Sequence, residues 1–324
     1  MNVLLLFVGI AALVVGAELV VTNGTVLARR LRISPIIIGL TVVSIGTSLP
    51  ELAVGIEGMT RGSGNLVIGN IVGTQIVNLL LIFGLMAAIR PVAIRGSTLR
   101  LDLPAVIIGS GLVWLLASNG QFHVWDGLAL LAFGIGYFWI VVATARRRAI
   151  TGPEAPELSA EERPPRPGSR FVVLEVGLLL AGLAIIVFGA EWMLDGAVGI
   201  AESLGVSDAL IGLTVVAIGT SAPELATALA STIKGGDRGI AVGNLIGSSA
   251  MNPTIILGGS LLFGPATIEV LPALVNVSIP LMVLGAIVLV PIFLTGKKVS
   301  RLEGTLMIAA YAAYLTYLIF DATQ

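Results

Sequence analysis

Ten apolar stretches, each about as long as a membrane span, dominate this sequence and limit the folds that it can adopt. They cover roughly residues 3–27, 34–59, 66–88, 101–118, 124–144, 171–193, 208–232, 239–263, 270–293 and 302–320. An α-helix needs about 20 consecutive apolar residues to cross the hydrocarbon core of a bilayer. Only 11% of the residues are charged, and none of the stretches contains a lysine or an arginine. The sequence therefore predicts an all-α integral membrane protein with ten transmembrane helices.

Composition argues against several other classes of protein. The net charge of −1 gives no basic footprint for nucleic acid, so no nucleic-acid partner is expected. Cysteine is absent, which excludes disulfides and thiolate metal sites. The apolar stretches also lack the short alternating pattern of a transmembrane β-barrel. Membrane lipid is the expected surrounding, and we expect the chain to be a monomer.

The positions of the basic residues predict how the spans are oriented. If ten spans alternate in direction, all of the 18 lysines and arginines except Arg61 fall in loops on one side. Basic residues concentrate in cytoplasmic loops. We therefore expect a multi-span protein of a bacterial-type inner (plasma) membrane, with both termini outside and residues 146–170 in the cytoplasm.

The two halves of the chain repeat each other. The stretch "IGLTVVSIGTSLPELA" (38–53) matches "IGLTVVAIGTSAPELA" (211–226), and "IGNIVGTQIVN" (68–78) matches "VGNLIGSSAMN" (242–252). Each half holds five spans, an odd number, so the second half must enter the membrane upside down relative to the first. We expect a first five-helix repeat at 1–145, a cytoplasmic linker at 146–170, and a second five-helix repeat at 171–324.

Each repeat carries a glutamate in the middle of a span, in "GTSLPE" (46–51) and "GTSAPE" (219–224). An ionised carboxylate at the bilayer centre costs roughly 3 kcal/mol or more, and the spans offer no basic residue to offset it. Either a bound metal ion or protons could supply the compensating charge. Pro50 and Pro223 each remove a backbone donor, so we expect helices 2 and 7 to be broken within 44–50 and 217–223, with carbonyls facing inward.

Oxygen-bearing side chains recur around the two glutamates. Thr47 precedes Glu51 by four residues, and Thr220 precedes Glu224 in the same way, so each pair shares one helix face. The same spacing recurs in the following helices, and each motif adds a serine hydroxyl. These further residues are Thr74, Asn78, Ser248, Asn252, Ser48 and Ser221. Carboxylate, hydroxyl and carbonyl oxygens are the ligands that Ca²⁺ and Na⁺ prefer, so four helices are predicted to converge on a site for such a cation.

At "GTSLPE", "GTSAPE", "GNIVGTQIVN" and "GNLIGSSAMN" the sequence resembles the sodium/calcium exchanger family of the cation/calcium exchanger superfamily, with these motifs as its two alpha repeats. The resemblance spans essentially the whole chain and is strongest at 35–84 and 208–258. It implies a secondary active antiporter, not an enzyme, that has no cofactor and exchanges Ca²⁺ for Na⁺ by alternating access. By the family pattern the calcium ligands are Glu51, Glu224 and the backbone oxygens of Thr47 and Thr220. The sodium sites would add Ser48, Ser221, Thr74, Ser248 and the carbonyls of Ser44 and Ala217, with Asn78 and Asn252 lining the centre.

Two residues depart from the family pattern. Some members, including potassium-dependent exchangers, carry aspartate where this chain has Asn252. The neutral side chain argues against potassium co-transport. Thr74 stands where serine is usual, which places an additional methyl group beside a sodium site.

Three alternative functions are considered. A Ca²⁺/H⁺ or other cation/H⁺ exchanger could use the same scaffold, because a pair of glutamates can also carry protons. A sodium-coupled symporter of a small organic solute would need an apolar pocket with a few polar anchors, which differs from this dense set of oxygens. A membrane scaffold without transport activity would not explain the two buried carboxylates.

Overall fold

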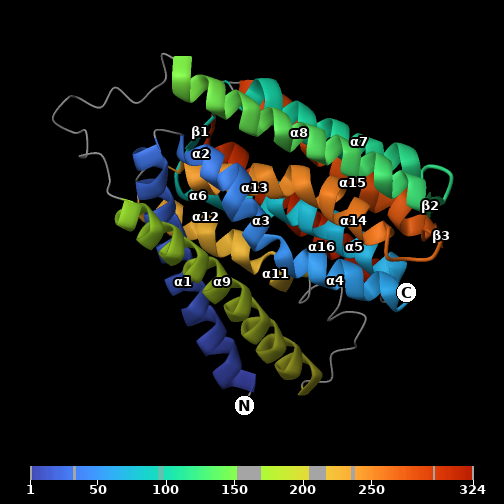
Figure 1. Ribbon diagram of the computed structural model, residues 1–324. Coiled ribbons are helices and arrows are strands. Elements are labelled where there is room, and N and C mark those ends of the chain that lie inside the picture. Colours follow the sequence, from blue (N-terminus) through green and yellow to red (C-terminus); the bar gives the residue numbers. More distant parts are fainter. Residues whose placement is uncertain are drawn as a thin grey trace.

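The computed structural model describes residues 2–31, 34–94, 96, 98–151, 169–203, 217–234, 238–294 and 296–322. Within these residues, eight helical stretches are long and apolar enough to cross a membrane. Most of them run alongside one another as a bundle, and α1 (Asn2–Leu31) and α9 (Ser169–Ser203) form a pair that crosses this bundle obliquely (Figure 1). Two further helical stretches, at 217–234 and 301–322, stand where the seventh and tenth spans are expected. The predicted helical membrane fold is confirmed, and the start of the seventh span, 208–216, lies outside the described residues.

The helices of the first half begin with α1, which is long and unbroken, and end with α8, which continues to Thr151. Their bounds are α1 Asn2–Leu31, α2 Pro35–Ile38, α3 Ser44–Thr47, α4 Leu49–Thr60, α5 Gly64–Ile76, α6 Phe83–Ile89, α7 Leu103–Ala117 and α8 Val124–Thr151. The beginning of the predicted linker is therefore helical. Residues 152–168 of that linker lie outside the described residues.

The helices of the second half follow in the same order. Their bounds are α9 Ser169–Ser203, α11 Ala217–Thr220, α12 Ala222–Lys234, α13 Gly239–Met251, α14 Leu257–Leu261, α15 Ile279–Leu294 and α16 Arg301–Ala322. The N-terminal helices of the two halves, α1 and α9, pack along each other (Figure 1). At one end of this pair, Arg30 Nε lies 2.7 Å from Glu175 Oε1. Glu175 is thus a buried partner of a basic residue.

Both motif helices are interrupted at the serine of the GTS sequence. Ser48 separates α3 from α4 with φ −91° and ψ 7°, and a turn at Ser221 separates α11 from α12. The proline two residues later has no N–H to donate to the helix, which explains why regular hydrogen bonding fails there. The predicted breaks in helices 2 and 7 are confirmed.

Widened π-helical turns accompany the breaks, and the sequence did not predict them. They are η1 Gly39–Val43, η2 Val77–Ile82, η3 Thr98–Asp102, η5 Asn252–Ile256 and η6 Leu274–Ser278. The turns η2 and η5 occupy equivalent places in the two repeats, and they contain Asn78 and Asn252. In η5, Pro253 removes an N–H and so disturbs the α-helical pattern. Such turns are common at functional sites.

Two short strand pairs qualify the all-α prediction. β1 (Val92–Ala93) pairs antiparallel with β4 (Lys298–Val299), and β2 (Gln121–His123) pairs antiparallel with β3 (Thr267–Glu269). Figure 1 places β1 at the opposite end of the bundle from β2 and β3. The pairs therefore join the loop before α7 to the loop before α16 at one end, and the loops before α8 and α15 at the other. Ten spans that alternate in direction require this arrangement.

The repeats cross most closely at a pair of glycines. A Cβ atom built on Gly243 of α13 would collide with the carbonyl oxygen of Ile36 and lie 2.9 Å from Leu40 N. A Cβ atom on Gly39 would collide in the same way with Ile240 O. Gly247 is also tightly packed, with Leu40 O at 2.8 Å from its Cβ position. The close packing at Gly243 and Gly247 lets two helices that carry site residues approach each other.

We expect Gly243→Ala to lower the stability of the protein. The added methyl group meets backbone atoms that cannot rotate away, and overpacking of this kind costs about 1–3 kcal/mol. Gly111→Ala in α7 is the matched control, because a Cβ atom there meets nothing within 4 Å. Thermal unfolding in detergent should show a lower midpoint for Gly243→Ala and an unchanged or raised midpoint for Gly111→Ala. Equal midpoints in the two variants would contradict the close crossing.

Candidate cation site

The two helix breaks and the helices that follow them enclose a buried polar cluster at the centre of the bundle. The predicted site residues with described side chains are at most 4% exposed. They are Ser44, Thr47, Ser48, Glu51, Thr74, Asn78, Thr220, Ser221, Glu224, Ser248 and Asn252. Ala217, the remaining predicted residue, is the first residue of α11. The structure thus gathers residues that the sequence placed in two distant motifs.

Hydrogen bonds cross between the repeats in a symmetric way. Thr47 Oγ1 donates to Asn244 Oδ1 at 3.0 Å, and Thr220 Oγ1 donates to Asn70 Oδ1 at 3.3 Å. Each threonine belongs to the motif helix of one repeat, and each asparagine to the following helix of the other. Asn70 and Asn244 were not among the predicted site residues. The sequence does contain a pattern that could have identified them, because an asparagine recurs at the same place in both copies of the second motif.

Serine hydroxyls connect the first motif helix to the carboxylate of the second. Ser48 Oγ donates to Ser248 Oγ at 3.3 Å, and Ser248 Oγ donates to Glu224 Oε1 at 3.1 Å. On the other side of the cluster, Thr74 Oγ1 lies 3.5 Å from Thr220 Oγ1. Hydroxyl oxygens from four helical segments therefore lie around the two glutamates.

Several buried oxygens of the cluster have no hydrogen-bond partner among the described residues. They are both carboxylate oxygens of Glu51, Oε2 of Glu224 and the amide oxygens of Asn78 and Asn252. Glu51 and Glu224 also lie close enough for their charges to repel each other. Buried charges and unpaired polar atoms are costly unless something compensates them. A cation among these oxygens would satisfy them, and the donor set of carboxylates, amides and hydroxyls suits Ca²⁺ or Na⁺.

A second equivalent pair lies directly beside the cluster. Gln75 follows Thr74, and Ser249 follows Ser248 at the matching position of the other repeat. Gln75 Nε2 donates to the carbonyl oxygen of Ser249 at 2.9 Å, and both side chains are fully buried. This hydrogen bond connects α5 to α13 next to the site.

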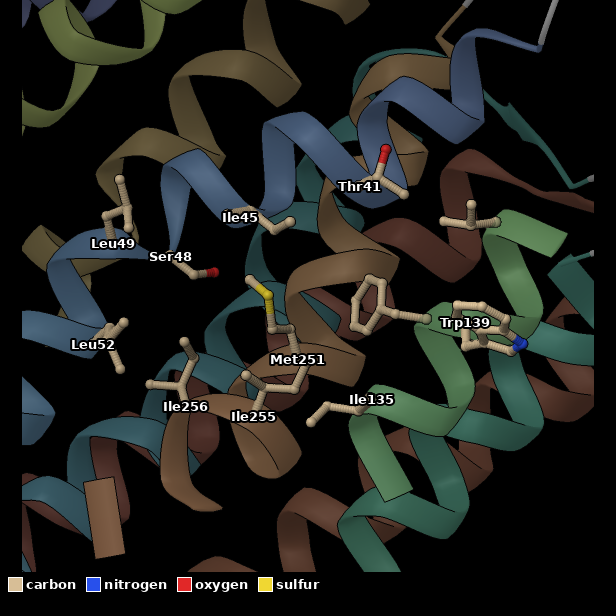
Figure 2. Close-up of a pocket in the computed structure, with 12 residues that line it drawn as sticks. Thr41, Ile45, Ser48, Leu49, Leu52, Ile135, Trp139, Met251, Ile255 and Ile256 are labelled. Atoms are coloured by element: carbon tan, nitrogen blue, oxygen red, sulfur yellow. The ribbon is translucent and has the colours of Figure 1, made fainter. Parts of the chain in front are cut away.

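An apolar pocket of about 510 Å³ lies on the other side of Ser48 (Figure 2). Its lining includes Ile45, Leu49 and Leu52 near the break in the first motif helix and Ile135, Phe138 and Trp139 of α8. Its polar lining residues are the hydroxyl-bearing Thr41 and Ser48. No charged side chain is among its described lining residues, and its apolar walls offer little to an ion. The cation cluster and this pocket are separate features that share Ser48.

Proteins that resemble this chain include a putative antiporter and a sodium/calcium exchanger. A family model described as sodium/calcium exchanger protein matches residues 1–143 and 174–320. The putative antiporter CaxA of Alkalimonas amylolytica is 33% identical to this chain over 97% of both proteins. The inner membrane protein YrbG of Escherichia coli (strain K12) is 36% identical over 86% of this chain and 85% of its own. The sodium/calcium exchanger MaX1 of Methanosarcina acetivorans is 30% identical over 98% of this chain and 99% of its own.

Solved structures show the same fold. The sodium/calcium exchanger from Methanococcus jannaschii matches with a TM-score of 0.81 and 28% identity over 97% of both chains. A structure of the exchanger NCX_Mj soaked with Na⁺ and Sr²⁺ matches with a TM-score of 0.82 and 29% identity, again over 97% of both chains. The similarity covers both repeats and therefore the whole cluster.

We expect Glu51→Gln and Glu224→Gln each to weaken Ca²⁺ binding by roughly 100-fold or more, because each removes a buried charge that faces the ion. Uncharged glutamine is easier to bury, so both variants should fold. Glu57→Gln is the control, since Glu57 is 61% exposed and pairs with Arg61 at 2.6 Å. Isothermal titration calorimetry on purified protein measures the affinities. Wild-type affinity in both motif variants would remove these glutamates from the site.

Proposed function

Because the chain belongs to the sodium/calcium exchanger protein family, we propose that it is a secondary active antiporter that exchanges Ca²⁺ for Na⁺ across the membrane. Members of the family are transporters of cations, not enzymes. The observation that carries the proposal is the pair of fully buried glutamates, one from each inverted repeat, with carboxylate oxygens that lack partners among the described residues.

The ligand assignment follows the cluster. Glu51 and Glu224 would bind Ca²⁺ together with the backbone oxygens of Thr47 and Thr220. The sodium sites would use Ser48, Ser221, Thr74, Ser248 and the carbonyls of Ser44 and Ala217, while Asn78 and Asn252 line the centre. Burial of these side chains supports the assignment, because an ion held there would exchange its water shell for protein oxygens.

Alternating access fits the inverted symmetry of the repeats. If the two repeats exchange conformations, a site between them opens first to one side of the membrane and then to the other. The basic residues favour an orientation with both termini outside and residues 146–170 in the cytoplasm. The relative YrbG is an inner membrane protein, and we propose the same location for this chain.

Charge explains why exchange should be tightly coupled. Asn78 and Asn252 are neutral, so Glu51 and Glu224 give the centre at most two negative charges. One Ca²⁺ neutralises them. An empty site would carry two bare carboxylates through a medium of low dielectric constant, which is costly. The empty carrier should therefore seldom change its orientation.

A cation/H⁺ exchanger is the second candidate. The unpartnered oxygens of Glu51 and Glu224 favour it, because protons could also neutralise them. It shares the scaffold and the calcium ligands with the first candidate, and it differs only in the coupling ion.

The coupling ion can be identified in proteoliposomes. We expect vesicles loaded with Na⁺ to take up ⁴⁵Ca²⁺ from a sodium-free medium at equal pH on both sides, with a protonophore present. Vesicles loaded with choline should take up none, and neither should sodium-loaded vesicles that contain Glu224→Gln. Uptake driven by a pH gradient without Na⁺ would instead establish the cation/H⁺ exchanger.

Exchange should also respond to voltage. If three Na⁺ replace one Ca²⁺, as the family resemblance implies, each cycle moves one charge, worth about 2.3 kcal/mol per 100 mV. An inside-positive potential, set with valinomycin and external K⁺, should then accelerate calcium uptake into sodium-loaded vesicles. The potential at which net calcium flux vanishes gives the stoichiometry. A reversal condition independent of voltage would contradict three-for-one exchange and indicate two Na⁺ per Ca²⁺.

A further inference from the structure

A chain of hydrogen bonds leads from the first motif to the backbone of the second. Thr47 Oγ1 donates to Asn244 Oδ1 at 3.0 Å, and Asn244 Nδ2 donates to Thr227 Oγ1 at 2.9 Å. Thr227 Oγ1 in turn donates to the carbonyl oxygens of Glu224, at 2.9 Å, and Pro223, at 3.2 Å. All three side chains are fully buried. We call Thr47, Asn244 and Thr227 the relay.

The direction of the relay follows from counting hydrogens. A carbonyl oxygen only accepts, so the single hydroxyl hydrogen of Thr227 points to the backbone. Thr227 can then only accept from Asn244, which turns the amide nitrogen toward Thr227 and the amide oxygen toward Thr47. Thr47 must donate its one hydrogen to that oxygen.

This direction decides what Thr47 presents to the site. Thr47 Oγ1 is also within hydrogen-bonding reach of the carboxylate of Glu224 and lies 3.5 Å from the carbonyl oxygen of Ser44, so three acceptors compete for its one hydrogen. The count of hydrogens along the relay assigns that hydrogen to Asn244 Oδ1, at 3.0 Å. With its hydrogen held by Asn244, the Thr47 oxygen turns a lone pair toward that carboxylate. Two acceptors that face each other repel, and a cation between them would satisfy both.

The first repeat cannot build the same relay. "PELAT" (223–227) contains Thr227, whereas the equivalent stretch "PELAV" (50–54) ends in Val54. Asn70, the equivalent of Asn244, accepts from Thr220 at the longer distance of 3.3 Å and is only half-buried. The two threonines of the motifs are therefore held differently, although the motifs around them are nearly identical.

We propose that Asn244 and Thr227 are positioning residues that turn the hydroxyl hydrogen of Thr47 away from the ion, so that its oxygen faces the cation as an additional ligand. The proposal rests on the proposed cation exchange. It makes the oxygen of Thr47 a fixed hydrogen-bond acceptor on its side of the site.

Thr227→Val tests the relay, because valine keeps the shape of threonine and removes the hydroxyl. Without it nothing fixes the amide of Asn244, and the amide can turn its N–H₂ toward Thr47. We expect Ca²⁺ affinity to fall about three- to tenfold, the range of one lost hydrogen bond. The maximal exchange rate at saturating Ca²⁺ should change less than twofold, because Thr227 itself does not touch the ion.

Two variants serve as controls. Thr227→Ser keeps the hydroxyl and should restore wild-type affinity. Thr232→Val makes the same change on the same helix, where the hydroxyl donates to the carbonyl oxygen of Ala228 at 2.7 Å and plays no part in the relay. It should leave Ca²⁺ affinity unchanged. Equal losses in Thr227→Val and Thr232→Val would assign the effect to packing of α12 and overturn the proposal.

A double-mutant cycle distinguishes the relay from an effect on packing. If Asn244 and Thr227 act as one unit, Asn244→Ala combined with Thr227→Val should bind Ca²⁺ no more weakly than Asn244→Ala alone. Additive losses, or wild-type affinity in Thr227→Val, would overturn the relay. Calorimetric binding of Ca²⁺ needs no transport, so it tests the relay separately from the coupling ion. Loss of sodium-driven flux with the binding results intact would reject only the proposed exchange.

Discussion

The rest of this structure depends on two carboxylates that lie in the middle of the membrane, where no span contains a basic residue that could pair with them. Glu51 and Glu224 are fully buried, and three of their four oxygens lack a partner among the described residues. Such a centre is tolerable only when a cation occupies it or protons neutralise it. The helix breaks and the surrounding hydroxyls can be understood as means to hold that cation, since each places oxygen atoms where a regular apolar helix would have none.

Inverted symmetry explains how one short motif builds a site from both sides. Thr47 and Thr220 each reach an asparagine of the opposite repeat, and Gly39 and Gly243 meet where the repeats cross. The strand pairs obey the same symmetry, because β1 and β3 are equivalent, as are β4 and β2. Contacts that cross between repeats tie their conformations together, which is what an exchange of conformations between repeats requires.

Features that follow from the internal repeat or from the chemistry of single residues could be predicted from the sequence. Features that depend on contacts between distant residues could not. The helix breaks were predictable because Pro50 and Pro223 act locally through the backbone. The π-helical turns were not, since only Pro253 marks one of them in the sequence. The strand pairs are two or three residues long, too short for an alternating pattern to reveal. Nothing in the sequence distinguishes Thr227 from other threonines in helices. Its hydrogen bond from Asn244 becomes apparent only in the structure, where the two side chains lie side by side.

The departures from symmetry bear most directly on function. A perfectly symmetric site would offer the same ligands from both repeats and would have no feature that distinguishes one face of the ion from the other. This chain differs at Thr74 and Ser248, and again at Val54 and Thr227. Ser248 contacts Glu224 at 3.1 Å, whereas both carboxylate oxygens of Glu51 lack a partner among the described residues. Because one carboxylate is held by a neighbouring hydroxyl and the other is not, Glu51 has fewer contacts to break when the occupant changes. An exchanger site must bind Ca²⁺ and then release it in favour of a different cation. Ligands that are fixed on one side of the ion and can rearrange on the other side would suit that task.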